Sequence, residues 1–461
     1  MRVKIILAVI SGLILGSVIF FLPWLALVLF AVGGIMVSLY SFLPHESRKF
    51  LLALFVSALA LRVIVALMLF IVSYGSDILR PSSVNVNPGE TIIAGDASGY
   101  SAYGWLLSEY WKGDRSVFSK DEQVALGRYF FTAQTYLLAI LYYLFGCMPL
   151  LGIILNSIAG ALSAVIIFFI AHRCCGLSAA RITAILTAFW PSIFLWSVNN
   201  SKEPISMLSM QAALLAGMIL YRKISLRFLA LFAAGVSVFF IYQPQLAVFF
   251  LFWLALIFII KIFRYPEVKA NLRGIILICV ICILLLNLVM PLSGIIRVKS
   301  TNLLNATVSR NIGSFLTGGS VYKIFPDSLY TNEVFRTGSF TDKIAPFNWM
   351  LAVLKGLFYF LFAPFPWMGG SLLKSAGKIE MLLWYIMMPF FFFGILLNVK
   401  LRNRELGLLA VFLVFVTFVY SLAEANVGTT FRHRSIILPL YFLFVASALD
   451  HLGVHNYGTV Q

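Results

Sequence analysis

The chain has 461 residues, of which 61% are hydrophobic and 11% charged, and its mean hydropathy is +0.98. Soluble globular domains carry about a quarter charged residues, so this composition excludes a soluble globular protein. The 34 Lys and Arg outnumber the 17 Asp and Glu. Nucleic acid would explain this surplus in a soluble protein; here, basic loops that orient membrane helices and basic groups that face anionic lipid explain it better.

The hydrophobic residues are arranged in blocks long enough to cross a bilayer, which takes about 20 apolar residues. We predict an all-α polytopic membrane protein with about twelve transmembrane helices. Two further apolar segments, 129–150 and 346–368, are interrupted or flanked by polar residues and prolines, so we expect interfacial helices there. The predicted spans are 5–22, 24–43, 50–73, 151–171, 182–198, 204–221, 228–242, 245–263, 274–292, 380–399, 406–423 and 435–450.

Charge in the short connecting segments determines the predicted orientation. With a cytoplasmic N-terminus and alternating spans, sixteen basic residues fall on the cytoplasmic side beside only three acids. This is the positive-inside pattern. It requires both interfacial segments to stay on the outer surface, in two large extracytoplasmic loops at about 74–150 and 293–379. The basic residues are Arg2, Lys4, Arg48, Lys49, Arg173, Arg181, Arg222, Lys223, Arg227, Lys261, Arg264, Lys269, Arg273, Lys400, Arg402 and Arg404.

The first large loop contains the motif Gly95-Asp96-Ala97-Ser98-Gly99-Tyr100, followed by an aromatic segment suited to a membrane surface. A general base must be ionised and within hydrogen-bond reach of the group that it activates. An acid in this loop can meet a lipid headgroup without burial in hydrocarbon, and the glycines leave room for close approach. We therefore predict Asp96 as a catalytic residue and Tyr100 as a substrate contact. The alternative is a solvated aspartate, because the same residues favour turns.

A second candidate site is Asn199-Asn200-Ser201-Lys202-Glu203-Pro204, at an outer turn between two spans. Pro204 is suited to a helix start, where its missing N–H costs nothing. Glu203 is predicted as a second catalytic carboxylate, and Lys202 as a ligand for a phosphate. The alternative for Glu203 is a structural acid that the dipole favours at a helix N-terminus. Asp96 and Glu203 together could hold a divalent ion, but two carboxylates are weak evidence for one, so the metal stays unknown and no other cofactor is expected.

Two further groups of cations are candidates for substrate binding. Arg432, His433 and Arg434 lie just before the predicted last span, on the outer side that the positive-inside pattern leaves poor in basic residues. A guanidinium matches phosphate oxygens with two donors, and the alternative is snorkelling to anionic headgroups. Arg62 lies at the middle of the third span, where a charge is costly and usually faces a cavity or partner. Its alternative role is helix packing against backbone carbonyls.

Read together, these motifs resemble membrane glycosyltransferases of the GT-C class, in particular the bacterial protein O-mannosyltransferase and lipid A aminoarabinose transferase family. The likeness covers about residues 50–225, from Leu61-Arg62 through the Asp96 motif to Lys202-Glu203-Pro204. Between these lie Tyr136-Leu137-Leu138, Asn156-Ser157, Ala171-His172-Arg173 and Ala188-Phe189-Trp190-Pro191-Ser192, and late in the chain Phe431-Arg432-His433-Arg434 with Pro439. Many members carry an acidic pair in the first loop, where this chain has Asp96 followed by alanine.

The resemblance implies a multi-pass protein of the plasma (inner) membrane with its active site on the extracytoplasmic face. It implies transfer of a sugar from a polyprenyl-phosphate donor to a lipid, glycan or protein acceptor, with no nucleic acid partner. The family's first-loop acid, its catalytic base, matches Asp96, and its late arginine near the lipid phosphate matches Arg434 or Arg432. The sugar, the acceptor and the oligomeric state stay open.

Two other function classes remain as alternatives. O-antigen or capsule polymerases and ligases are also many-helix membrane proteins with outer arginines, but they usually lack an essential acid this early in the chain. A flippase for polyprenyl-linked oligosaccharides would carry charges along a path through its helices, whereas Arg62 is nearly the only charge predicted at depth.

The predicted organisation has four parts: an N-terminal transmembrane hairpin, a GT-C-like transmembrane core with the first outer loop, a second outer loop with an interfacial helix, and C-terminal transmembrane helices. Their bounds are 1–45, 46–292 (with the loop at 74–150), 293–379 and 380–461.

We predict that both termini are cytoplasmic. Cysteine substitutions near positions 96, 320 and 430 should react with an impermeant thiol reagent added to intact cells, whereas those at positions 48 and 402 should not. Labelling at position 402 from outside would overturn this topology.

Overall fold

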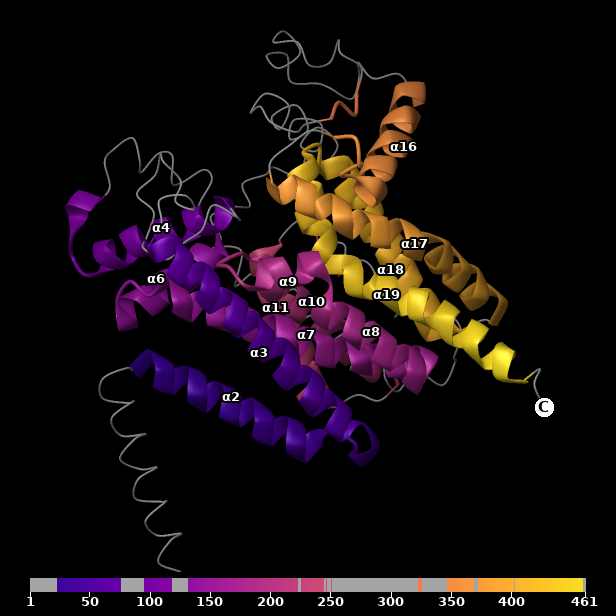
Figure 1. The fold of residues 1–461 in the computed structure, drawn as a ribbon, viewed down its shortest axis with the longest axis horizontal. Coiled ribbons are helices and arrows are strands. Elements are labelled where there is room, and N and C mark those ends of the chain that lie inside the picture. The colour runs from indigo at the N-terminus through magenta and orange to yellow at the C-terminus, as the bar shows by residue number, and fades with distance from the viewer. Residues whose placement is uncertain are drawn as a thin grey trace, which may run out of the picture. The chain divides into compact units, whose positions relative to one another are not determined.

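The computed structural model describes residues 23–75, 95–117, 132–222, 225–243, 246, 250, 322–325, 346–368, 372–401 and 403–458. Every regular element in these ranges is a helix (Figure 1). They are α2 (Pro23–Phe42), α3 (His45–Gly75), α4 (Gly95–Trp111), η3 (Arg115–Val117), α6 (Ala133–Phe145), α7 (Pro149–Cys175), α8 (Leu177–Phe189), α9 (Pro191–Ser197), α10 (Glu203–Arg222), α11 (Leu226–Tyr242), α16 (Pro346–Phe362), α17 (Leu372–Leu401), α18 (Arg404–Ala423) and α19 (Val427–Gly458).

Proline determines where several helices begin. Pro23, Pro149, Pro191 and Pro346 each occupy the first position of a helix, where the ring's fixed φ fits and no hydrogen bond is lost. Pro191 also breaks a predicted span, because the preceding Trp190 is extended, with φ −64° and ψ 128°.

Among the described residues, seven helices are long and apolar enough to cross a membrane, or eight if the pair α8 and α9, bent by 52°, counts as one span. The prediction of an all-α multi-pass protein is therefore confirmed, whereas the count of twelve is not reached in the described ranges. The predicted span 182–198 is this bent pair, and 228–242 is the shorter helix α11. Of the others, 5–22 and 274–292 lie outside the described residues, as does 245–263 apart from Leu246 and Phe250.

The two segments predicted as interfacial contain short helices. Segment 129–150 holds α6, of 13 residues, and the start of α7 at Pro149, while 346–368 holds α16, of 17 residues. Gly146 ends α6 with φ 78°, a left-handed conformation that favours glycine. Their place along the outer membrane surface stays a prediction.

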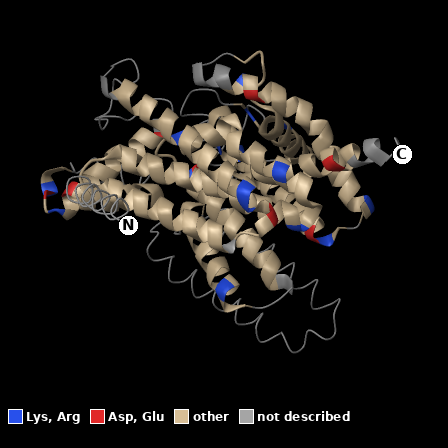
Figure 2. Ribbon diagram, turned by 60° about the horizontal axis from the view of Figure 1, so that its bottom comes forward, with Lys and Arg blue, Asp and Glu red and all other residues tan. Residues whose placement is uncertain are grey.

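The spans differ in how much of their apolar surface is buried in the protein and how much is left exposed. In the most apolar stretches of α7 and α10, 78% of residues are buried, against 22% in α3. The exposed face of α3 includes Ile64, Met68 and Ile71, which hydrocarbon solvates without cost. Figure 2 shows long stretches of helix without a charged residue.

The chain divides into two compact units. The first consists of Met1–Val165 with Ile193–Ile205, and the second of Ile166–Ser192 with Ser206–Gln461. The core of the first unit contains Tyr100, Leu138, Tyr142, Leu151 and Ile154. In the second unit α17 and α18 pack against α19, beside which they run in Figure 1, while α8 also packs on α19 and α16 on α18. Each unit combines segments from more than one of the four predicted parts. This division therefore neither confirms nor contradicts those parts.

Glycines permit the closest helix contacts in the second unit. A Cβ at Gly394 of α17 would overlap the carbonyl oxygen of Phe444 on α19, and one at Gly356 of α16 would overlap the carbonyl oxygen of Ser421 on α18. Small residues at such crossings let helix backbones approach closely, which is a main source of stability between membrane helices.

We predict that Gly394→Ala lowers the Tm of the purified protein, since overpacking costs about 1–3 kcal/mol. Gly33→Ala on α2 is the matched control, because its Cβ would meet no atom within 4 Å. An unchanged Tm for Gly394→Ala, measured by fluorescence unfolding in one detergent, would contradict this packing.

Candidate active site

Asp96 lies in the first turn of α4, and its side chain is exposed. The turn considered as the alternative for this motif is not found, because Gly95–Trp111 is a continuous helix. An acid in the first turn is favoured by the helix dipole, which helps this small, polar sequence to begin a helix.

Position 430, which was expected to be accessible to a thiol reagent, is different: Thr430 is buried within α19, and the exposed residue nearby is Gly428.

Helix α4 is held rigidly against α6. A Cβ on Gly104 would lie 2.9 Å from the Cβ of Leu138, so the backbones approach closely at this glycine. The hydroxyls of Ser101 and Tyr142 are hydrogen-bonded at 2.7 Å between the same two helices. Tyr100 is buried, 5% exposed, in the core of the unit. Asp96 therefore stands at the end of a firmly packed helix, whereas Tyr100 forms part of that packing.

The other acids of this loop among the described residues take part in local structure. Asp114 accepts hydrogen bonds from the Ser116 hydroxyl at 2.6 Å and from its backbone N–H at 2.9 Å. These bonds stabilise the charged carboxylate and hold the pKa of Asp114 below its usual value, which makes it a weaker base. Glu109 pairs with Lys112 at 2.8 Å. Both acids are therefore tied to neighbouring side chains of the same segment.

The turn before α10 is fastened to α7 by buried amides. Asn156 Nδ2 donates to the carbonyl oxygens of Asn199 and Ser201, both at 2.7 Å. Asn200 Nδ2 donates to the carbonyl oxygen of Pro149 at 3.2 Å. Gly152 of α7 makes room for the Asn200 side chain, which its Cβ would overlap. The turn that carries Lys202 and Glu203 is thereby fixed in one position.

Within this turn, further hydrogen bonds close the chain on itself. The N–H of Ser201 donates to Asn199 Oδ1 at 3.0 Å, and the Ser201 hydroxyl donates to the carbonyl oxygen of Trp196 at 2.6 Å. Glu203 then begins α10, as predicted, and is only 2% exposed, while Lys202 is half-buried.

Arg62 is buried within α3 and connects it to α9. Its Nε donates to the Ser197 hydroxyl at 2.8 Å, and its Nη1 donates to the carbonyl oxygen of Ala58 at 3.1 Å. The guanidinium also lies over the Phe194 ring, 5.1 Å from the centroid. Gly160 of α7 leaves space for this contact, since its Cβ would come within 3.0 Å of Arg62 Nε. These contacts favour the helix-packing role for Arg62.

The cations near the C-terminus lie inside α19, not before it as the sequence predicted, because the helix begins at Val427. Arg434 is 1% exposed, and its Nη1 donates to the carbonyl oxygens of Phe360, Leu361 and Ala363 at 2.9–3.0 Å. It therefore satisfies carbonyls at the C-terminal end of α16, which a helix end otherwise leaves without donors. A guanidinium committed in this way is poorly placed to bind a lipid phosphate.

His433 and Arg432 differ from Arg434 in their surroundings. His433 Nδ1 lies 3.1 Å from Glu424 Oε1, with both side chains buried, and its ring stacks on Tyr420. The tautomer determines which atom donates in this pair. Arg432 is half-buried. Of these three residues at the start of α19, Arg432 is the least buried.

Sequence reasoning missed two buried acids of the second unit. Glu380 Oε1 accepts hydrogen bonds from Trp190 Nε1 at 2.6 Å and from the Ser192 hydroxyl at 2.8 Å, and it attracts Arg434. Glu424 pairs with His433. An acid inside or directly after an apolar span was the signal that could have found them. Buried charged residues are thus more numerous than the sequence predicted. Glu380 and Arg434 are nevertheless held by fixed partners, so they do not form the charged path through the helices that a flippase would need.

Asp96 and Glu203 belong to the first unit, and Arg432 and His433 to the second. In the described part of the chain, no three His, Cys, Asp or Glu side chains gather as metal ligands. The divalent ion considered for Asp96 and Glu203 therefore gains no third ligand of these types there.

No family model matches the chain, and no curated protein matches it. Among solved structures it is similar to ArnT from Cupriavidus metallidurans, also solved bound to undecaprenyl phosphate, with 13% identity and a TM-score of 0.45 over 87% of this chain and 61% of that one. It is also similar to the oligosaccharyltransferase AglB from Archaeoglobus fulgidus, in complex with an inhibitory peptide and a dolichol-phosphate, with 15% identity and a TM-score of 0.43 over 88% of this chain and 51% of that one.

Both neighbours are GT-C enzymes, the class that the sequence resembles. The likeness is distant, and this chain spans only 61% and 51% of the lengths of the two proteins. The activity proposed below therefore rests on this chain's own residues.

We predict that Asn156→Ala lowers the Tm more than Ser163→Ala on the same helix. Asn156 alone donates to two buried carbonyls of the α10 turn, and each acceptor left without a donor costs about 1–3 kcal/mol. Ser163 donates to the carbonyl oxygen of Ala159, one turn earlier in its own helix. Equal Tm values for the two variants would show that the turn holds its shape without Asn156.

Proposed function

We propose that this protein is a multi-pass membrane glycosyltransferase that transfers a sugar from a polyprenyl-phosphate donor to an extracytoplasmic lipid, glycan or protein acceptor. One observation carries the proposal: a single compact unit holds two carboxylates at helix N-termini, Asp96 exposed and Glu203 immobilised. The predicted orientation puts both outside the cytoplasm. The proposed location is the plasma (inner) membrane.

The two carboxylates have environments suited to different tasks. Asp96 is exposed, so it can remain ionised and reach an acceptor hydroxyl or amine. Its proposed role is general base: it takes the acceptor's proton as the acceptor oxygen or nitrogen attacks the anomeric carbon and the lipid phosphate leaves. Glu203 is buried at a turn that hydrogen bonds hold in place, and it is proposed to orient the substrate. Lys202 beside it is proposed to contact a phosphate oxygen.

For the lipid phosphate we propose Arg432 as the principal guanidinium ligand. Arg432 is half-buried, whereas the fully buried Arg434 supports the end of α16. His433, paired with Glu424, would position the start of α19 beside the donor. Arg62 and Tyr100 are proposed to support the acid-bearing helices, because both are buried in the packing of the first unit.

We predict that Asp96→Asn lowers the turnover of sugar transfer in vitro by about 10²- to 10⁴-fold, the usual contribution of a general base. Asparagine keeps the shape of the side chain but accepts no proton, so folding and donor binding should persist. The measurement is transfer from a defined polyprenyl-phosphate sugar, with donor affinity determined separately.

Asp114→Asn is the matched control, because Asp114 lies in the same predicted loop and its hydrogen bonds with Ser116 give it a local structural task; its turnover should stay near wild type. Glu203→Gln should have a milder effect than Asp96→Asn. Near wild-type turnover of Asp96→Asn together with an inactive Glu203→Gln would reverse the two roles.

A further inference from the structure

Helix α9 positions the turn before α10, because that turn is built on the last carbonyl oxygens of α9. Asn199 Nδ2 donates to the carbonyl oxygen of Leu195 at 2.8 Å, and the Ser201 hydroxyl donates to that of Trp196 at 2.6 Å. With seven residues at about 1.5 Å each, α9 is only about 10 Å long. The direction in which α9 leaves its first residue therefore influences where the turn lies.

The last residue of α9 is fixed by α3 and α7. Arg62 Nε donates to the Ser197 hydroxyl at 2.8 Å, and the Ser157 hydroxyl donates to the Ser197 carbonyl oxygen at 3.0 Å. One fixed point does not determine the direction of a short helix, because the helix can still pivot about it. A second fixed point at the start of α9 is needed.

Glu380 of α17 provides this second point. Glu380 is 3% exposed, and its Oε1 accepts hydrogen bonds from Trp190 Nε1 at 2.6 Å and from the Ser192 hydroxyl at 2.8 Å. The N–H of Ser192, which as a helix-start donor has no partner within α9, is also hydrogen-bonded to this carboxylate. The carboxylate thus connects the residues on either side of Pro191, where α8 and α9 are bent by 52°.

The acid and the bend are themselves held by α19. Glu380 and Arg434 attract each other, and Arg434 Nη2 is hydrogen-bonded to Sδ of Met381 at 2.8 Å. The Trp190 ring packs against Phe442, with the ring centroids 4.8 Å apart. The bend is therefore fastened to two long helices of the second unit, α17 and α19.

We propose that Glu380 is a positioning residue for sugar transfer, which holds the bend before α9 and thereby sets the place of Lys202 and Glu203. The chain passes from the second unit to the first within α9, between Ser192 and Ile193, so a displacement at Glu380 reaches the turn along the helix itself. The effect on catalysis rests on the proposed function, whereas the effect on the turn does not depend on any activity.

The first experiment measures the turn directly. Lys202→Cys, in a chain whose five native cysteines are replaced by serine, reacts with a water-soluble maleimide at a rate that reports how open the turn is. We expect Glu380→Leu to raise this rate by about tenfold, because buried hydrogen bonds are lost. Glu380→Gln should stay near the parent rate, since its amide oxygen still accepts from Trp190 and Ser192. Trp190→Phe combined with Ser192→Ala removes the donors instead and should reproduce the effect of Glu380→Leu.

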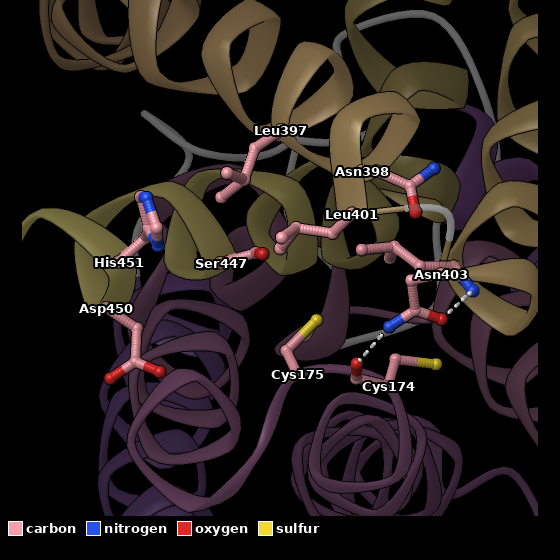
Figure 3. Close-up of a pocket in the computed structure, with 10 residues that line it drawn as sticks. Cys174, Cys175, Leu397, Asn398, Leu401, Asn403, Ser447, Asp450 and His451 are labelled. Atoms are coloured by element: carbon pink, nitrogen blue, oxygen red, sulfur yellow. Dashed lines mark hydrogen bonds between the residues drawn. The ribbon is translucent and has the colours of Figure 1, made fainter.

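Glu405→Leu is the matched control, because Glu405 is another largely buried acid of the second unit and pairs with Arg173 at 2.8 Å. Without this ion pair α18 is still fastened to α7, since Asn403 Nδ2 donates to the carbonyl oxygen of Cys174 at 2.7 Å in the wall of a small cavity (Figure 3). Its labelling rate should equal that of the parent. An equal rise in this control, or an unchanged rate in Glu380→Leu, would overturn the proposal.

The second experiment measures sugar transfer with the native lysine at position 202. Glu380→Leu should raise the KM for a defined polyprenyl-phosphate sugar by about tenfold and change kcat far less, because the displaced turn is proposed to orient the substrate. A mere loss of folded protein would lower the apparent kcat and leave the KM unchanged. In the Glu203→Gln background the further rise in KM should largely disappear, since both side chains act through the same contact.

A rise in KM of the same size in both backgrounds would show that Glu380 does not act through Glu203, and would overturn the positioning role in catalysis. If the wild-type protein transfers no sugar, the proposed function fails, while the labelling rates still decide whether Glu380 holds the turn.

Discussion

Two hydrogen bonds from one buried amide, from Asn156 Nδ2 to the carbonyl oxygens of Asn199 and Ser201, set the position of the acid-bearing end of α10. Asn199 and Ser201 are buried inside the protein, where water cannot reach them, so the carbonyls of this turn must find donors in the protein. Asn156 supplies them from the neighbouring helix. Together with the hydrogen bonds of Asn200 and Ser201, these two bonds fix the turn that carries Lys202 and Glu203.

The same physical rule shapes the second unit. The chain leaves its helical path at the end of α16 and again at Trp190, and at each place a buried polar side chain supplies the missing partner. Arg434 donates to three carbonyls at the end of α16, and Glu380 accepts from Trp190 and Ser192 where the helix breaks. These charges are costly to bury alone. The attraction between Glu380 and Arg434 and their hydrogen bonds offset this cost and stabilise the helix breaks at the end of α16 and at Trp190.

The sequence by itself determined the class of protein, the position of most described spans and the start of α10 at Glu203. These depend on local properties, namely runs of apolar residues and a proline that suits a helix start. The sequence did not determine that the Asp96 motif begins a helix, since the packing of Gly104 on Leu138 contributes to that choice.

Nor did it determine the partners of Arg434 and Glu380, which lie 71–74 and 188–190 residues away along the chain. Only the tertiary structure decides which of the buried charges are structural and which can face a ligand. The reason is that the role of a buried charged side chain depends on the groups that contact it. Those groups come from distant segments of the chain, which only tertiary packing brings together.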